Sequence, residues 1–229
     1  LDGSPVTEAD RAAEKILLIA LKNLAPEILV ISEENADSHF RTAQKQFFLV
    51  DPLDGTKEFL KKDGKGSFTV NIGLIENNLP VMGIVYAPAR NEMFFGCKNI
   101  GSWRVANGEK TKISVREPMK NKITAVASTS HRDLETNQWL KEQNISDTIS
   151  IGSSLKFCLI ASGQADVYPR FGTTMEWDTA AGDAILRAAG GAVTQPNLSD
   201  FNYGKKLYKN DPFIAWGGYS VKKKLTISQ

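Results

Sequence analysis

Phe47-Phe48-Leu49-Val50-Asp51-Pro52-Leu53-Asp54-Gly55-Thr56-Lys57 is the stretch of sequence that most restricts the fold, because an apolar strand runs directly into a polar turn. The turn carries two carboxylates, a glycine and a hydroxyl. Because proline fixes its backbone angle, we expect Pro52 to bend the chain after the strand, so that Asp51 and Asp54 can face one cation or a pair of cations. Gly55 and Thr56 are expected to open a helix, whose first backbone N–H groups can bind a phosphate. Hard oxygen ligands of this kind suit Mg²⁺.

The loop alone leaves a structural and a functional interpretation open, because Asp-Pro and Asp-Gly are ordinary turn dipeptides. Two further acidic clusters favour the functional one. Ser32-Glu33-Glu34 follows the apolar run 28–31, and Asp178 lies in the segment Trp177-Asp178-Thr179-Ala180-Ala181-Gly182-Asp183. The three clusters together predict an acidic metal site assembled from distant parts of the chain.

Composition bounds the domain organisation and the partners. The 229 residues, 41% hydrophobic and 24% charged, can bury a large core, and we expect two subdomains, 1–118 and 119–229. With 28 basic and 26 acidic residues the net charge is +2, too balanced for a nucleic-acid coat, so nucleic acid is not expected as a partner. Oligomeric state is left open between a monomer and a homodimer.

Location is predicted from apolar runs and cysteines. No apolar stretch approaches the roughly 18 residues of a membrane span, and no signal-like start is visible. Of the two cysteines, Cys158 stands in the apolar run 157–161, where a buried reduced thiol is expected. The two histidines, His39 and His131, are too few and too far from the cysteines for a zinc site. We expect a cytoplasmic protein without an integral membrane segment, and attachment to the surface of the inner membrane is left open.

The pattern of apolar residues predicts helix plus antiparallel sheet first and an α/β arrangement afterwards. Thr7-Glu8-Ala9-Asp10 reads as a capping box that opens a helix, which ends before Pro26. Period-2 alternation predicts an antiparallel meander from strands at 68–76, 81–86, 92–96, 102–105 and 112–115, with a turn at 77–80. Beyond it, strands at 123–127, 148–151, 165–168 and 192–194 alternate with helices at 134–143, 155–162 and 179–189. This alternation predicts a mixed sheet.

Four motifs in order carry a family resemblance: Asp2-Gly3-Ser4-Pro5-Val6-Thr7-x-x-Asp10, Ser32-Glu33-Glu34, Asp51-Pro52-Leu53-Asp54-Gly55-Thr56 and Trp177-Asp178-x-Ala180-Ala181-Gly182. Over nearly its whole length the chain resembles the lithium-sensitive, Mg²⁺-dependent phosphatases of the inositol monophosphatase superfamily. Residues 51–59, Gly152-Ser153-Ser154-Leu155-Lys156-Phe157-Cys158 and Tyr168-Pro169-Arg170-Phe171-Gly172 look like the bacterial 3′(2′),5′-bisphosphate nucleotidase branch. The resemblance implies a layered αβαβα sandwich. Such proteins usually begin with a further helix, so we expect a truncated or partly disordered N-terminus.

The resemblance also implies the metal ligands. Two or three Mg²⁺ ions would be held by the backbone carbonyl of Leu53 and by four carboxylates: Glu33, Asp51, Asp54 and Asp178. Paired metal ions suit phosphate ester hydrolysis, because they can activate a water and stabilise the leaving oxygen. Glu34 is left open between a contact to metal through water and a solvated neighbour.

The same resemblance implies that Asp10 and Thr56 act as a pair that orients and deprotonates the attacking water, with Glu33 the third catalytic residue. From the residues alone, the reciprocal cap with Thr7 is the preferred interpretation of Asp10, and both roles can coexist. Asp178 likewise has an alternative role as the N-cap of the helix that ends at 190–191.

Substrate residues follow from the nucleotidase branch. The scissile phosphate would contact the turn and the last carboxylate: Leu53, Asp54, Gly55, Thr56 and Asp178. Ser153, Lys156 and Arg170 would hold the second phosphate and the nucleoside, because arginine offers a bidentate fork that a neutral inositol ring does not need. His131 would approach the base or ribose. Alternatively, Lys156 is solvated on a helix surface and Arg170 caps a sheet edge.

The substrate implied is adenosine 3′,5′-bisphosphate, cleaved to AMP and phosphate, with its sulfated analogue as a second substrate and a link to sulfate assimilation. Two other functions stay open. The chain could hydrolyse inositol 1-phosphate or fructose 1,6-bisphosphate, or it could be a non-catalytic nucleotide sensor that keeps the fold and binds its ligand.

Overall fold

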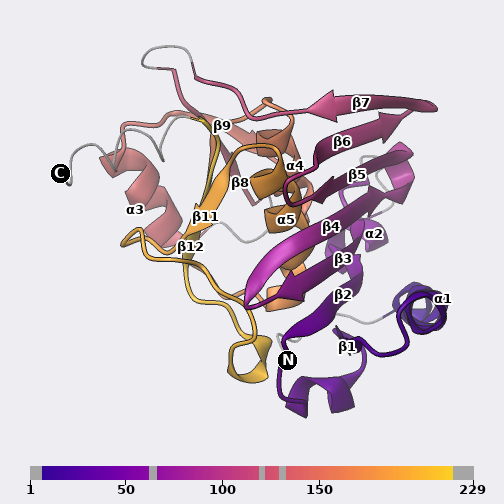
Figure 1. Ribbon diagram of the computed structural model, residues 1–229. Helices are drawn as coiled ribbons and strands as arrows, with labels where there is room; N and C mark the ends of the chain where they lie inside the picture. Colours follow the sequence, from indigo (N-terminus) through magenta and orange to yellow (C-terminus); the bar gives the residue numbers. More distant parts are fainter. Residues whose placement is uncertain (1–6, 62–65, 119–121, 129–132, 219–229) are drawn as a thin grey trace.

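The computed structural model describes residues 7–61, 66–118, 122–128 and 133–218. Two β-sheets and the helices around them form five layers (Figure 1). Helix α1 (Glu8–Leu24) covers the outer face of the first sheet, α4 (Leu155–Ala161) and α5 (Ala180–Ala188) lie between the sheets, and α3 (Leu134–Glu142) covers the second sheet. The layered αβαβα arrangement expected from the family resemblance is confirmed.

The first sheet has seven strands in the order β1 to β7. Their bounds are β1 Leu29–Ser32, β2 Gln46–Asp54, β3 Thr69–Glu76, β4 Leu79–Ala87, β5 Glu92–Cys97, β6 Gly101–Ala106 and β7 Glu109–Ile113. The β1–β2 pair is parallel and the other pairs are antiparallel, which extends the predicted meander by a parallel edge. The β3–β4 turn is tighter than expected, because Asn77 and Asn78 alone connect the strands, both with positive φ.

Strand β2 is buried on both faces. Phe48 and Val50 pack with residues of α1, whereas Phe47 and Leu49 belong to the central core between the sheets. This explains the continuous apolar run, which is typical of a strand with both faces covered. Contrary to expectation, the strand does not end before Pro52. It continues to Asp54, and the bend is an irregularity in the β2–β3 pairing between Asp51 and Asp54.

The second sheet is mixed, as predicted, in the order β11-β12-β10-β8-β9. Its strands are β8 Thr124–Ala127, β9 Asp147–Ser150, β10 Val167–Arg170, β11 Ala192–Thr194 and β12 Phe213–Trp216. Short helical segments complete the fold: α2 Thr56–Leu60 and the 3₁₀ turns η1 Ala36–Phe40, η2 Pro88–Arg90, η3 Glu176–Asp178 and η4 Lys206–Tyr208. Strand β12 is absent from the sequence prediction, because a four-residue apolar run has no periodicity to identify it.

Helix α5 packs on the first sheet along a row of glycines. Gly73, Gly83 and Gly96 are paired neighbours on β3, β4 and β5, and a Cβ at Gly83 would lie 2.1 Å from the carbonyl oxygen of Ala181. The row therefore lets a helix from the second half of the sequence approach the sheet of the first half. One hydrophobic core extends across both halves, and the division at residue 118 stays a prediction. Among the described residues, no helix combines the length and apolar character needed to cross a membrane.

Candidate active site

A cavity of about 530 Å³ collects most of the predicted site residues. Its lining includes Glu33, Asp51, Leu53, Asp54, Gly55, Thr56, Ser153, Lys156, Arg170 and Asp178. Residues from both halves of the sequence thus meet at one place. His131 lies outside the described residues, and Asp10 is not among the lining residues.

The end of β2 forms one wall of the cavity. The backbone N–H of Leu53 donates to Oδ1 of Asp51 at 3.0 Å, so the carboxylate itself stabilises the bend. Gly55 follows with φ of +94°, a left-handed conformation that glycine adopts without strain, and α2 begins at Thr56 as predicted. The hydroxyl of Thr56 donates to the carbonyl oxygen of Leu53 at 3.3 Å. The predicted turn thus closes on itself through its own polar groups.

Glu33 reaches the same wall because β1 runs parallel to β2. Ser32 pairs with Val50, and the backbone N–H of Glu33 donates to the carbonyl oxygen of Val50 at 3.1 Å. This register places Glu33 beside Asp51, and their carboxyl groups are hydrogen-bonded to each other. Burial, followed by the negative charge of Asp178, raises the pKa of Glu33 to about 9. Burial and the neighbouring negative charges therefore disfavour the charged form of both carboxyl groups, whose pKa values are raised.

Asp54 and Asp178 meet through Ser154. The Ser154 hydroxyl lies 3.1 Å from Oδ2 of Asp54 and 2.8 Å from the backbone carbonyl oxygen of Asp178, and it accepts a hydrogen bond from the side-chain amide of Asn71. Burial raises the pKa of Asp54, against the lowering effects of Lys156 and Ser154. A single buried hydroxyl therefore connects the two strands β2 and β3 to the turn that carries Asp178.

Asp178 ends the 3₁₀ turn η3 and does not cap α5, whose N-cap is Thr179. The alternative of an N-cap role on α5 is therefore wrong. Its carboxylate instead accepts the backbone N–H of Met175 at 2.8 Å, which closes the turn in front of the helix.

The acidic part of the cavity has the donor chemistry of a divalent-cation site. Burial and the charges of its neighbours raise the pKa of Asp51 well above its usual value, and a cation would relieve that repulsion. Carboxylate and carbonyl oxygens are the ligands that Mg²⁺ prefers. Within the described ranges, no three His, Cys, Asp or Glu side chains already have the arrangement of a formed metal site. The residues present fit the ion in chemistry, and the cavity brings them to one place.

The cavity is also lined by the basic residues Lys57, Lys156 and Arg170, which we call its cationic part. Lys156 is only 7% exposed, so the alternative that it is solvated on a helix surface is wrong. Its ammonium donates to the carbonyl oxygen of Ser153 at 2.6 Å and lies over the ring of Tyr168, 5.4 Å from the centroid. Arg170 stands at the end of β10, and its guanidinium donates to the carbonyl oxygen of Thr173. Lys156 and Arg170 share the cavity with the carboxylates.

Asp10 takes the structural role that the residues alone suggested. It is 2% exposed, and its carboxylate accepts hydrogen bonds from the backbone N–H of Thr7, at 2.8 Å, and from the Thr7 hydroxyl, which completes a capping box on α1. Thr56 meanwhile donates to Leu53. A catalytic pairing of Asp10 with Thr56 stays a prediction.

Sequence reasoning missed three polar residues at this site. Ser154 and Asn71 are buried behind Asp54, and Asp133 lines the cavity, where it accepts the backbone N–H of Gly172 at 2.9 Å in the loop after Arg170. Ser154 lies inside the motif at 152–158, directly after Ser153, which the resemblance assigns to substrate binding. No local signal marks Asn71, because an asparagine in a strand acquires this role only when β3 pairs with β2.

Comparison with known proteins agrees with this geometry. The model of the inositol monophosphatase family matches residues 2–227. The 3′(2′),5′-bisphosphate nucleotidase CysQ of Salmonella typhimurium is 48% identical over 193 residues, which are 84% of this chain and 76% of that protein. CysQ of Buchnera aphidicola is 41% identical, over 96% of this chain and 81% of that protein.

A solved structure of CysQ from Bacteroides thetaiotaomicron superimposes with a TM-score of 0.81 at 37% identity, over 96% of this chain and 87% of that one. An inositol monophosphatase from Anabaena has a TM-score of 0.76 at 26% identity, over 97% of this chain and 86% of that one. The sequence motifs, the layered fold and the extent of these matches agree. The chain belongs to the inositol monophosphatase family.

Proposed function

We propose that this chain is a Mg²⁺-dependent phosphatase that hydrolyses the 3′-phosphate of adenosine 3′,5′-bisphosphate and releases AMP and phosphate. The observation that carries the proposal is that the side chains of Lys156 and Arg170 line the same cavity as the carboxylates Glu33, Asp51, Asp54 and Asp178. A substrate with two phosphate groups suits this lining, because its second phosphate needs cations beyond the metal site. The nucleotidase name of relatives at 48% and 41% identity supports the same substrate class.

The acidic part would hold Mg²⁺ through Glu33, Asp51, Asp54, Asp178 and the carbonyl of Leu53. When bound, Mg²⁺ would supply an activated water and charge stabilisation of the phosphoryl group during in-line displacement. Whether two or three ions bind stays a prediction, as do the catalytic roles given to Asp10, Thr56 and Glu33.

The chain's own contribution at the cationic part is to bind and orient. Burial lowers the pKa of Lys156 to about 8, and the negative charge of Asp54 opposes that effect, so the ammonium stays mostly protonated at neutral pH. The backbone carbonyl oxygen of Ser153 accepts a hydrogen bond from this ammonium and so fixes its position. Arg170 would add a planar fork for the second phosphate. Contacts of Ser153 and His131 with the nucleoside stay predictions.

Phosphate release from three substrates tests the proposal. With Mg²⁺ present, adenosine 3′,5′-bisphosphate should be hydrolysed far faster than inositol 1-phosphate or fructose 1,6-bisphosphate, and added Li⁺ should inhibit the reaction. A preference for either sugar phosphate would favour the alternative phosphatase. Tight nucleotide binding without phosphate release from any substrate would leave the non-catalytic sensor. The sulfated analogue of the nucleotide belongs in the same assay, because the link to sulfate assimilation depends on it.

A pair of variants tests the cationic part separately. Lys156→Met keeps most of the buried volume but removes the charge, and kcat/KM for adenosine 3′,5′-bisphosphate should fall by about 10- to 100-fold, the value of a hydrogen bond to a charged group. Lys22→Met on the exposed face of α1 is the matched control. Activity on inositol 1-phosphate should change little in either variant. Equal losses on both substrates would contradict a role for Lys156 in binding a second phosphate.

The comparisons support a small-molecule substrate but do not determine where the protein is located or whether it is a monomer or a homodimer. The substrate is a small molecule, whereas cytoplasmic location, association with the inner membrane, and the choice between monomer and homodimer stay predictions.

A further inference from the structure

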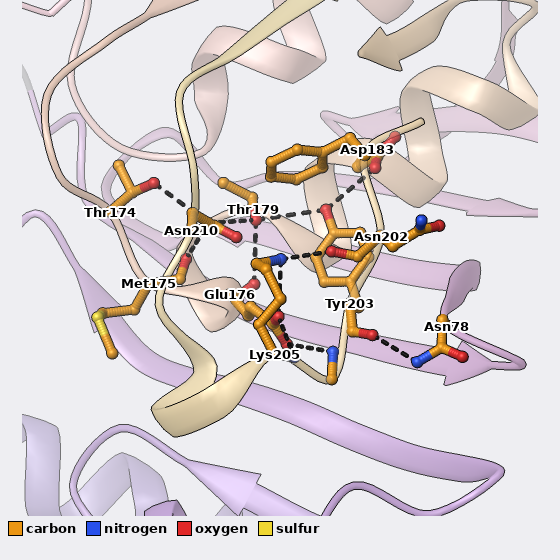
Figure 2. Close-up of polar contacts among 12 residues, drawn as sticks. Asn78, Thr174, Met175, Glu176, Thr179, Asp183, Asn202, Tyr203, Lys205 and Asn210 are labelled. Atoms are coloured by element: carbon orange, nitrogen blue, oxygen red, sulfur yellow. Dashed lines mark hydrogen bonds and ion pairs between the residues drawn. The ribbon is translucent and has the colours of Figure 1, made fainter. Parts of the chain in front are cut away.

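The turn that carries Asp178, residues 174–179, has little regular structure of its own. It consists of η3 and of one isolated bridge between Met175 and Lys209. Most of its remaining polar contacts come from residues 203–210, which we call the brace segment (Figure 2). Both segments are far from the β2 carboxylates in sequence, and Thr174, Asp178 and Thr179 of the turn line the cavity.

Asn210 in the brace segment joins both ends of the turn. Its side-chain amide nitrogen lies 2.7 Å from the carbonyl oxygen of Met175, 3.1 Å from the hydroxyl of Thr174 and 3.0 Å from the hydroxyl of Thr179. Figure 2 shows how the amide faces these three residues. Its backbone N–H also donates to the carbonyl oxygen of Thr174 at 3.0 Å. Met175 is the residue whose N–H holds the carboxylate of Asp178. Asn210 thus contacts Met175, the residue that donates a hydrogen bond to the carboxylate of the predicted metal ligand Asp178.

Glu176 fixes the middle of the turn to the same segment. Its side chain is completely buried and accepts the backbone N–H groups of Gly204 at 2.8 Å and Lys205 at 2.9 Å. The ammonium of Lys205 lies 2.8 Å away and completes an ion pair. Because a buried carboxylate with three donors cannot leave without exposing unpaired groups, this contact resists any opening between turn and brace.

Tyr203 connects the brace segment both to the start of α5 and to the first sheet. Its hydroxyl lies 3.0 Å from Oδ2 of Asp183 and 3.3 Å from the hydroxyl of Thr179. Its backbone carbonyl accepts the side-chain amide of Asn78 at 2.7 Å, and its N–H donates to the Asn78 carbonyl (Figure 2). Asn78 lies in the β3–β4 turn of the first sheet. The brace is therefore connected to the sheet that supplies the other carboxylates.

We propose that Asn210 and Tyr203 are positioning residues for Asp178, which hold the 174–179 turn at a fixed distance from the carboxylates of β2. The inference rests on the proposed function, because it assigns Asp178 to the Mg²⁺ site. Like charges repel Asp178 from Glu33, Asp51 and Asp54, and a turn with a single 3₁₀ element would relax away from them without external hydrogen bonds. Hydrogen-bonding partners behind a metal ligand usually affect affinity about 10- to 100-fold.

Mg²⁺ titration of the substrate-free protein by calorimetry tests this inference. Asn210→Ala should weaken Mg²⁺ binding by about 10-fold, and Tyr203→Phe should weaken it in the same direction by a smaller factor. Tyr208→Phe is the matched control, because Tyr208 is equally buried in the brace segment but its hydroxyl donates to the carbonyl of Arg41, away from the turn. Its Mg²⁺ affinity should equal that of the wild type.

A kinetic readout separates positioning from a merely structural role. In Asn210→Ala the Mg²⁺ concentration for half-maximal phosphate release should rise with the calorimetric Kd, while KM for the nucleotide at saturating Mg²⁺ stays unchanged. If Asn210→Ala does not fold, the comparison of Tyr203→Phe with Tyr208→Phe decides. If Asn210→Ala and Tyr203→Phe both have lower melting temperatures but wild-type Mg²⁺ affinity, the inference is overturned and the proposed function still stands. A wild-type protein that binds no Mg²⁺ would overturn it together with the proposed function.

Discussion

Replacing Gly83 by alanine should displace the helix that follows the Asp178 turn. The added Cβ would lie 2.1 Å from the carbonyl oxygen of Ala181 and 2.9 Å from its Cα, both backbone atoms that cannot rotate away. Non-bonded carbon atoms prefer separations of about 3.5–4.0 Å, so β4 and α5 must separate by about 1 Å or more. Helix α5 begins at Ala180, two residues after Asp178. The separation would therefore move Asp178 away from the carboxylates of β2.

The magnitude follows from two known costs. Overpacking a core destabilises by about 1–3 kcal/mol, and a 1 Å misplacement of reacting groups costs about 100-fold in rate. We expect urea unfolding of Gly83→Ala to give a free energy of unfolding lower by about 2 kcal/mol, and phosphate release to fall about 100-fold where the variant is fully folded.

Gly108→Ala is the control for Gly83→Ala, because Gly108 has positive φ but open space around it, so it adds backbone strain of about 1 kcal/mol without touching α5. Wild-type turnover and Mg²⁺ affinity in folded Gly83→Ala would refute the reasoning.

Three further predictions concern single residues of the site. Asp54→Asn should abolish turnover in the phosphate-release assay, because it removes a carboxylate from the predicted metal site; wild-type rates would exclude Asp54 as a ligand. Ser154→Ala should lower the free energy of unfolding by about 1–3 kcal/mol, the cost of leaving buried polar partners unsatisfied, and Ser38→Ala, which also removes a buried hydroxyl, serves as the control away from the cavity. Finally, burial and the charge of Asp178 raise the pKa of Glu33 from 4.5 to about 9, so the unfolded chain releases this proton first and the metal-free protein should lose stability as pH rises between these values. Thermal melts of wild type and Glu33→Gln in a chelator check this, and equally steep pH profiles would contradict it.

The sequence was sufficient for most helices and strands, because their signals are local. The capping box at Thr7 and the helical spacing of apolar residues predicted α1, and period-2 alternation predicted β3 to β6 within a few residues. Strand β7 was predicted three residues too late and β12 was missed, because an edge strand of charged residues and a four-residue apolar run both lack a clear period. Pro52 was given a strand-ending role that the chain accommodates by an irregularity in the pairing instead.

The site residues likewise divide into those with a local sequence signal and those whose role depends on the folded chain. Carboxylates after apolar strands can be found in a sequence, because a charge at the end of a buried run is unusual and needs a partner. The burial of Lys156 could not be found that way, since it depends on α4 lying between two sheets. The role of Asn210 is equally invisible: an asparagine is ordinary in a loop, and only the folded chain brings its amide to the turn of residues 174–179.

The carboxylates of this site belong to two walls, and packing rather than covalent proximity sets the distance between them. Glu33, Asp51 and Asp54 are carried by β1 and β2, whereas Asp178 depends on the position of α5. Three separate contacts determine that position: the glycine row on the sheet side, the hydroxyl of Ser154 at the cavity and the brace segment behind the turn. Because each contact has its own partners, the free-energy losses of Mg²⁺ binding should add when two contacts are removed together, so the fold-losses in affinity should multiply. Affinity losses in Gly83→Ala combined with Tyr203→Phe that fall well short of the product of the single effects would mean that sheet and brace act through one shared movement of α5.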